Sequence, residues 1–202
     1  MPPRKGLSTK AIVTAGIILI MVMSSLGFIL QNAGGGAQRF GKYKFSPSGS
    51  GTWTVKAQGQ QFEVFFLPTQ LADIGLEDGM TQKLRAPVLV ASIDPPPLNL
   101  TRLDNAIGLV SYQYVNELPK LGTEVVLALG SAPGEDALPG LRAMPVISCG
   151  NATPEVPVIY VRKGDSTGFH LEGDCIVMEA ASEQDIYRLY DRMLLSLLGV
   201  MP

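Results

Sequence analysis

The most apolar part of the sequence is a continuous run close to its start. Residues 11–30 carry no charged side chain, and a helix of about 20 residues spans roughly the 30 Å hydrocarbon core of a bilayer. A helix buried in a soluble core normally keeps a polar stripe, which this run lacks. The pattern therefore predicts a transmembrane helix over residues 11–30, in contact with membrane lipid.

The next part of the chain changes to short alternating patterns. Residues 31–41 are rich in glycine and are typical of a flexible linker. Beyond them, apolar and polar residues alternate in three runs separated by glycine-containing turns, which predicts a three-stranded antiparallel meander. Pro68 would end its third strand, and a short helix is expected over residues 70–74. The apolar face of the meander would carry Tyr43, Phe45, Trp53, Val55, Phe62, Val64 and Phe66.

From residue 87 the pattern becomes that of a β-α-β unit. Apolar runs at 87–93 and 124–129 predict two buried strands, and apolar residues at helical spacing lie between them. Thr101 and Asp104 have the spacing of a capping box at the start of this helix. A strand, a helix and a second strand in this order favour parallel strands with a right-handed crossover.

The last third of the chain predicts more short strands and a final helix. Strands are expected near 145–149, 157–161 and 169–179, and Ser182 would cap an amphipathic helix that ends at Gly199. The fold class that follows is α/β (mixed α+β). It places a meander, a β-α-β unit and a C-terminal amphipathic helix in one domain over residues 42–202.

Charge places these parts relative to a membrane. The chain has 16 Lys and Arg and 18 Asp and Glu, for a formal net charge of −2. Arg4, Lys5 and Lys10 precede the apolar run, so the positive-inside rule predicts a cytoplasmic segment over residues 1–10 and a domain outside the cell membrane. Without those three charges the net charge is −5, which argues against a nucleic-acid partner.

Two processing alternatives remain open at the N-terminus. Small residues at Gly35 and Ala37 would allow a secretory signal to be cut after Ala37. Separately, Arg4, Lys5 and Gly6 before a long apolar helix resemble the class III signal of archaeal pilins. That resemblance implies a cut after Gly6 and a filament subunit.

The two cysteines, Cys149 and Cys175, are too few for a four-ligand zinc site and do not form a C-x-x-C motif. Cys149 shares its strand parity with Ile147, as Cys175 does with Phe169 and Leu171. Both sulfurs would then point into the core, which predicts a structural disulfide in an oxidising compartment. Free buried thiols or a redox-active pair are the alternatives.

Two kinds of functional side chain stand out in the external part. Asn99 and Asn151 each begin an N-x-Thr acceptor pattern for N-glycosylation. His170, Glu172 and Asp174 alternate on one predicted strand, on the face opposite to Cys175, and could bind a divalent metal or act in acid-base catalysis. The alternative interpretation is the solvated face of an amphipathic strand. We identify no catalytic residue by motif and expect no cofactor.

Two further segments have a structural and a functional interpretation each. Asp94 is followed by three prolines, and this rigid segment either turns the chain or offers a docking site. The apolar stretch 194–201 either completes the core or contacts a partner or the membrane surface.

Part of the sequence resembles a family of short archaeal single-pass membrane proteins of uncharacterised function. The resemblance covers Trp53 to Ile74, including Leu67-Pro68, and the end of the chain from Gly173 to Met201. It implies an archaeal membrane protein and assigns no site residues.

Taken together, these observations favour a binding or structural module anchored in the membrane, acting through contacts with a protein partner in an envelope or membrane assembly. A pilin-like subunit and a metal-assisted enzyme using His170, Glu172 and Asp174 are the alternatives.

Overall fold

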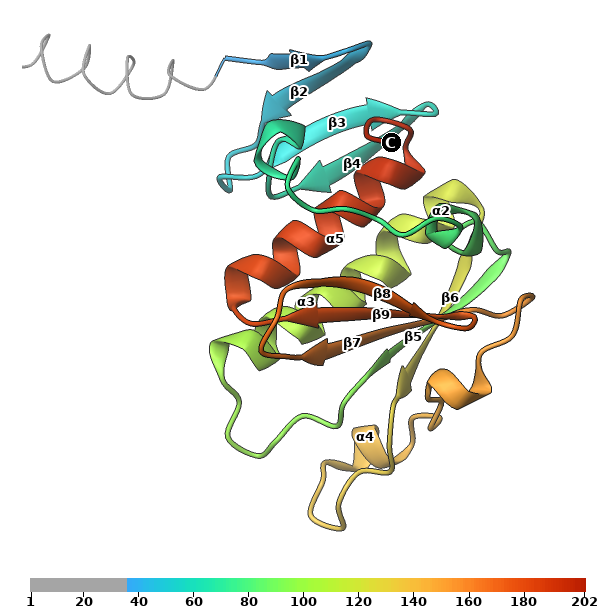
Figure 1. Cartoon of the computed structure of the whole chain (residues 1–202). Coiled ribbons are helices and arrows are strands. Elements are labelled where there is room, and N and C mark those ends of the chain that lie inside the picture. Colours follow the sequence, from blue (N-terminus) through green and yellow to red (C-terminus); the bar gives the residue numbers. More distant parts are fainter. Residues whose placement is uncertain (1–35) are drawn as a thin grey trace, which may run out of the picture. The chain divides into compact units, whose positions relative to one another are not determined.

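The computed structural model describes residues 36–202, and all of its elements belong to one compact unit, Gln38–Pro202 (Figure 1). The expected transmembrane helix over residues 11–30 and the pilin-like signal at Arg4, Lys5 and Gly6 lie outside the described residues. Gly35 of the alternative signal cut after Ala37 also lies outside them. Within residues 36–202, no helix has the length and apolar character that a membrane span requires.

The predicted meander is confirmed, with one additional strand. β2 (Tyr43–Pro47), β3 (Trp53–Ala57) and β4 (Gln60–Val64) pair in antiparallel order, and β1 (Gln38–Phe40) adds to β2. β1 occupies residues that the sequence analysis assigned to the linker. The alternating apolar positions Phe45, Val55, Phe62 and Val64 are all fully buried. We call this four-stranded sheet the meander sheet.

A five-stranded mixed sheet forms the centre of the domain, with the order β6-β5-β7-β9-β8. β5, β6, β7 and β9 are parallel, and β8 is antiparallel to β9 at the edge. We call it the central sheet. Its strands are β5 (Val88–Ile93), β6 (Glu124–Leu129), β7 (Val158–Lys163), β8 (Gly168–Glu172) and β9 (Cys175–Ala180).

The predicted β-α-β unit is also confirmed. α3 (Arg102–Glu117) connects the parallel strands β5 and β6 and continues into the short 3-10 helix η2 (Leu118–Leu121). Thr101 caps α3, because its hydroxyl accepts a hydrogen bond from the Asp104 N–H while the Asp104 carboxylate accepts one from the Thr101 N–H. Asp104 thus makes both hydrogen bonds of the capping box, in the place where Glu or Gln is commoner.

α5 (Glu183–Leu197) is capped by Ser182, as predicted, and lies between the two sheets (Figure 1). Its buried Asp191 accepts hydrogen bonds from the N–H groups of Phe65 and Phe66, which leave the meander sheet after β4 (2.7 and 2.6 Å). Because both sides of the helix are covered, every residue from Leu189 to Leu198 is buried. Residues 194–198 are therefore part of the core, whereas Gly199 is exposed and Val200 and Met201 are partly buried against it.

Three predicted elements are wrong. The expected strand over 169–179 is a hairpin of β8 and β9 with its turn at Gly173, whose φ of +64° favours glycine. The expected strand at 145–149 is a single bridge between Val146 and Leu129, followed by the 3-10 helix η3 (Cys149–Asn151). The expected helix over 70–74 is the 3-10 helix η1 (Pro68–Gln70), which begins at the proline.

Two further single-turn helices complete the fold, α2 (Met80–Lys83) and α4 (Pro139–Arg142). The two faces of the central sheet are covered differently. α3 and α5 pack on one face, which we call the helix face. On the opposite face a second apolar cluster forms under residues 145–153, which we call the covering segment. That cluster contains Val90, Ala128, Val158, Cys175 and Val177, with Ile147 and Cys149 packed on it.

Candidate functional site

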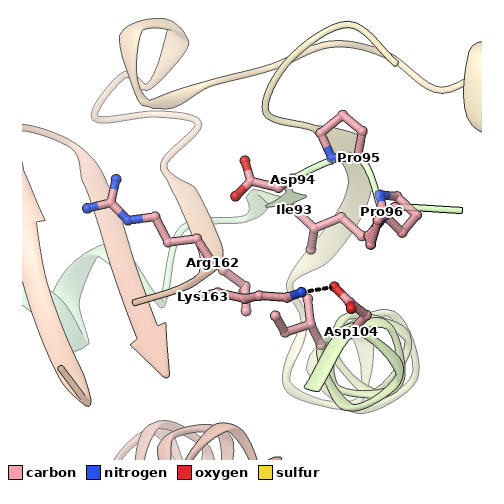
Figure 2. A pocket seen from close by; sticks show the side chains of 10 residues that line it. Ile93, Asp94, Pro95, Pro96, Asp104, Arg162 and Lys163 are labelled. Atoms are coloured by element: carbon pink, nitrogen blue, oxygen red, sulfur yellow. Dashed lines mark ion pairs between the residues drawn. The ribbon is translucent and has the colours of Figure 1, made fainter. Parts of the chain in front are cut away.

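A pocket opens at the carboxyl ends of β5 and β7, with a cavity volume of about 220 Å³. The chain runs from β5 to β6 on one side, then crosses back to place β7 on the other side of β5. In open α/β sheets, ligands bind at such a reversal of strand order, outside the carboxyl ends of the strands. We call it the carboxyl-edge pocket (Figure 2), and its lining is Ile93, Asp94, Pro95, Pro96, Pro97, Asp104, Ile107, Val161, Arg162 and Lys163.

One side of the pocket is fixed by an ion pair between β7 and the start of α3. The Lys163 Nζ atom lies 2.6 Å from Asp104 Oδ1, while Asp104 Oδ2 accepts hydrogen bonds from the Thr101 N–H and hydroxyl. The Asp104 side chain is only 6% exposed. Its burial raises the pKa, but the hydrogen bonds from Lys163 and Thr101 outweigh that effect and hold the pKa of Asp104 below its ordinary value.

On the other side of the pocket, Asp94 directly follows β5. Its Oδ1 atom accepts a hydrogen bond from the Tyr160 hydroxyl on β7. Burial, together with the neighbouring Asp94 carboxylate, raises the pKa of Tyr160 to about 12, so this hydroxyl keeps its proton at neutral pH. The Tyr160 ring passes so close to Gly130 that a Cβ there would lie 2.6 Å from ring carbon Cε2. Gly130 is therefore required for Tyr160 to reach Asp94.

Arg162 lines the pocket with its stem, whereas its guanidinium points away from Lys163 (Figure 2). The guanidinium contacts Glu179 on β9, with Arg162 Nη2 2.7 Å from Glu179 Oε1. This hydrogen bond from Arg162 is the largest cause that lowers the pKa of Glu179. Both cationic side chains of the lining are thus paired with carboxylates.

The predicted group of His170, Glu172 and Asp174 does not assemble. His170 Nε2 lies 3.2 Å from Glu172 Oε1 on β8, but Asp174 is in the turn after β8 and pairs with Lys83 of α2. Within residues 36–202, no group of three or more His, Cys, Asp or Glu side chains is arranged to hold a metal ion. His170 and Glu172 form an exposed pair at the edge of the central sheet.

The orientation of these residues also differs from the prediction. His170 pairs with Val177 and Glu172 with Cys175 across the hairpin, and residues directly opposite in a sheet point to the same face. His170 and Glu172 therefore share the face of Cys175 rather than the opposite one. The hairpin turn at Gly173 and Asp174 resets the alternation that a continuous strand would have kept.

The predicted disulfide between Cys149 and Cys175 is present. The geometric reason given for it from sequence is wrong, because Cys149 lies in η3 and Cys175 faces away from Phe169 and Leu171. The bond instead joins the covering segment to the first residue of β9, where Cys175 is fully buried.

The two glycosylation candidates have different surroundings. Asn99 lies in the exposed loop between β5 and α3, two residues after Pro97 of the pocket. The side chain of Asn151 accepts hydrogen bonds from the N–H (2.9 Å) and hydroxyl (3.2 Å) of Ser148, in a turn that also contains Cys149.

Sequence reasoning identified the segment from Asp94 to Pro97 and the cap at Asp104, but not the pocket that they form. Lys163 and Tyr160 were missed, because their partners lie 59 and 66 positions away along the chain. The available signal was that polar residues follow two parallel strands whose carboxyl ends meet at one edge. Comparisons with models of protein families, with curated proteins and with solved structures find no match to this chain.

Proposed function

We propose that this protein is a binding module held in the cell membrane by a single N-terminal helix, with the domain of residues 38–202 outside the cell. It acts through contacts with a protein partner in an envelope or membrane assembly. The carboxyl-edge pocket carries the proposal, because it lies where ligands bind in open α/β sheets. In this proposal it is the surface that contacts the partner.

The character of the pocket supports binding rather than chemistry. Lys163 and Asp104 neutralise each other, Arg162 pairs with Glu179, and Tyr160 donates to Asp94. A nucleophile or general base needs a reactive atom that is free to face the substrate. In this pocket the polar groups instead hold the walls in place, and a preformed wall lowers the entropy cost of binding.

The membrane location has its own support. The run of residues 11–30 is uncharged and follows the basic residues Arg4, Lys5 and Lys10. The disulfide Cys149–Cys175 belongs in an oxidising compartment, as an external domain would require. The resemblance to archaeal single-pass membrane proteins agrees with the same arrangement.

Site-specific photo-crosslinking in native membranes tests the binding function. A photoreactive residue at Leu98, which is 74% exposed beside Pro97, should form an adduct with a partner protein of one defined mass. The same residue at Lys56, which is exposed on the meander sheet, serves as the control. Adducts of equal yield and mass from both positions, or none from Leu98, would contradict a partner at the pocket.

Protease treatment of intact cells tests the topology separately. We expect the domain to be digested from outside, leaving a membrane-bound N-terminal fragment. Sequencing the N-terminus of the native protein then separates the alternatives. A start at Leu7 would favour the filament subunit, and a start at Gln38 would give a secreted protein.

A further inference from the structure

The hydrogen-bonding character of the pocket wall is one-sided. Pro95, Pro96 and Pro97 follow one another along the loop after β5 and line the pocket. Proline has no N–H group, so these three residues contribute no backbone donor to the pocket, and their polar backbone atoms are carbonyl acceptors. This part of the wall therefore favours a ligand that brings donors, as an ammonium or guanidinium group does.

The charge of the pocket also favours a cationic ligand. Lys163 is paired with Asp104 and Arg162 with Glu179, whereas the partner found for Asp94 is the neutral hydroxyl of Tyr160. Among the described residues no ion pair includes Asp94. The uncompensated charge at the pocket is therefore the Asp94 carboxylate, whose remaining oxygen can accept from a cation.

The floor of the pocket is apolar. Ile93, Ile107 and Val161 line it, and the latter two are almost completely buried. In Figure 2, Ile93 lies between the Asp94 carboxylate and the Lys163–Asp104 pair. The cavity volume of about 220 Å³ is smaller than that of pockets for drug-sized molecules, which have volumes of about 300 Å³ or more. It matches one side chain or one small amine.

We propose that the carboxyl-edge pocket binds a protonated alkylamine or guanidinium group carried on a short apolar stem. The stem lies along Ile93 and Ile107, while the cation pairs with Asp94 and donates to the carbonyl groups of the proline wall. This inference rests on the proposed function, since it names the chemistry by which the partner is recognised. The occupant is a Lys or Arg side chain of that partner, and a free amine is the other source of the same chemistry.

Binding of small probes to the full chain in non-ionic detergent tests the chemistry. The probes are butylammonium and butylguanidinium, with 1-butanol and butyrate as neutral and anionic matches. Ile methyl NMR signals of Ile93 and Ile107 should shift with the two cations, with Ile176 as the internal reference. Butyrate shifting them as strongly as butylammonium would overturn the proposal.

Two variants that each remove one negative charge test whether Asp94 is the group that pairs with the bound cation. Asp94→Asn should weaken binding of butylammonium by up to about fivefold, the upper end of the range for an exposed ion pair. Asp165→Asn, on an exposed residue outside the pocket lining, should leave binding unchanged. If both variants bind like the unchanged protein, Asp94 is not the partner of the cation and the inference is wrong.

A blocked Gly-Lys-Gly tripeptide and its Gly-norleucine-Gly counterpart distinguish the two sources. Norleucine keeps the stem and removes the ammonium group, so the lysine peptide should bind more tightly, and only its binding should depend on Asp94. Butylammonium binding without lysine-peptide binding would reject a partner side chain as the occupant and leave the free amine.

These results separate the inference from the function on which it rests. Crosslinking at Leu98 that persists in Asp94→Asn, with no probe binding, would remove the cation chemistry and keep the protein partner. Probe binding that depends on Asp94, without a crosslinked partner, would keep the cation chemistry and remove the protein partner.

Discussion

The two faces of the central sheet are both buried, but by different means. On the helix face, the long amphipathic helices α3 and α5 cover the strands, and the meander sheet covers the other side of α5 (Figure 1). On the opposite face, residues 145–153 cover Val90, Val158 and Val177 without a helix longer than one 3-10 turn.

The difference shows how each cover is attached. The helix face is held by extensive apolar contact, which stabilises at roughly 25 cal/mol per Å² buried. The covering segment is held at particular atoms. The Leu129 N–H donates to the Pro145 carbonyl (2.9 Å), and the Ile147 N–H donates to the Leu129 carbonyl (2.8 Å). The Ser92 hydroxyl donates to the Ile147 carbonyl (2.6 Å). The disulfide joins Cys149 to β9. A short segment has too little apolar area to stay in place by packing alone.

The largest effect is expected where the meander sheet meets the helices. Asp191→Ala would remove the buried acceptor of the half-buried Phe65 and Phe66 N–H groups, at a cost of about 3 kcal/mol in the free energy of unfolding. Asp191→Asn keeps an acceptor oxygen and should cost about 1 kcal/mol. Urea unfolding followed by Trp53 fluorescence and circular dichroism measures both, and equal losses would show that the acceptor is unimportant.

The same pair of variants gives a pH dependence with a defined sign. Burial raises the pKa of Asp191 well above its ordinary value, although the hydrogen bonds from Phe66 and Phe65 lower it. A carboxyl group with a raised pKa in the folded state stabilises the protein below its unfolded pKa, and this contribution is lost as pH rises through the folded pKa. Stability of the unchanged protein should therefore fall with rising pH relative to Asp191→Asn.

Removing the disulfide tests the other cover. A Cys149→Ala, Cys175→Ala variant should lose about 3 kcal/mol, given the sequence separation of 26. We expect the loss to concentrate in the covering segment, so that the Ile147 and Leu129 amides, which hold it to β6, exchange hydrogen faster than the amides of β9. Uniformly faster exchange across the domain would show that the bond stabilises the fold as a whole.

A smaller and more selective test uses two valines of one strand. Val161 faces the helices and Val158 faces the covering segment, and both are fully buried on β7. Each Val→Ala change should cost about 2 kcal/mol in the oxidised protein. In the cysteine-free variant, the cost of Val158→Ala should fall below about 1 kcal/mol, while the cost of Val161→Ala stays unchanged. Equal costs in both backgrounds would mean that the covering segment does not depend on its disulfide.

The sequence predicted the helix face better than the opposite one for a physical reason. Amphipathic period and caps are local signals, and they located α3 from Thr101 and α5 from Ser182 within a residue. The covering segment has no period, so 145–149 was mistaken for a strand. The Gly173 turn was also missed, because apolar residues continue on both sides of it, and this reversed the predicted face of His170.

The candidate site follows the same division. Local patterns predicted a rigid segment at Asp94 and the prolines and a helix cap at Asp104, and these positions are near one another in sequence. Lys163, Tyr160 and Gly130 join them only through the parallel pairing of β5 with β6 and β7. Such pairing depends on contacts between distant residues, and local patterns carry little information about it.

The smallest expected effect concerns Tyr160, which reaches from the covered face to the pocket. Tyr160→Phe removes the hydrogen bond to Asp94 and should cost about 0.5–1 kcal/mol. The pKa of Tyr160 is about 12 in the folded protein against 10.0 ordinarily, so the stabilisation it contributes is present below pH 10 and is lost as pH rises toward 12. The unchanged protein should lose stability over that range relative to Tyr160→Phe, whereas Tyr112→Phe on the exposed side of α3 should match the unchanged protein. If Tyr160→Phe instead shows the same alkaline loss, the hydroxyl does not hold Asp94, and the pocket and the covered face are independent.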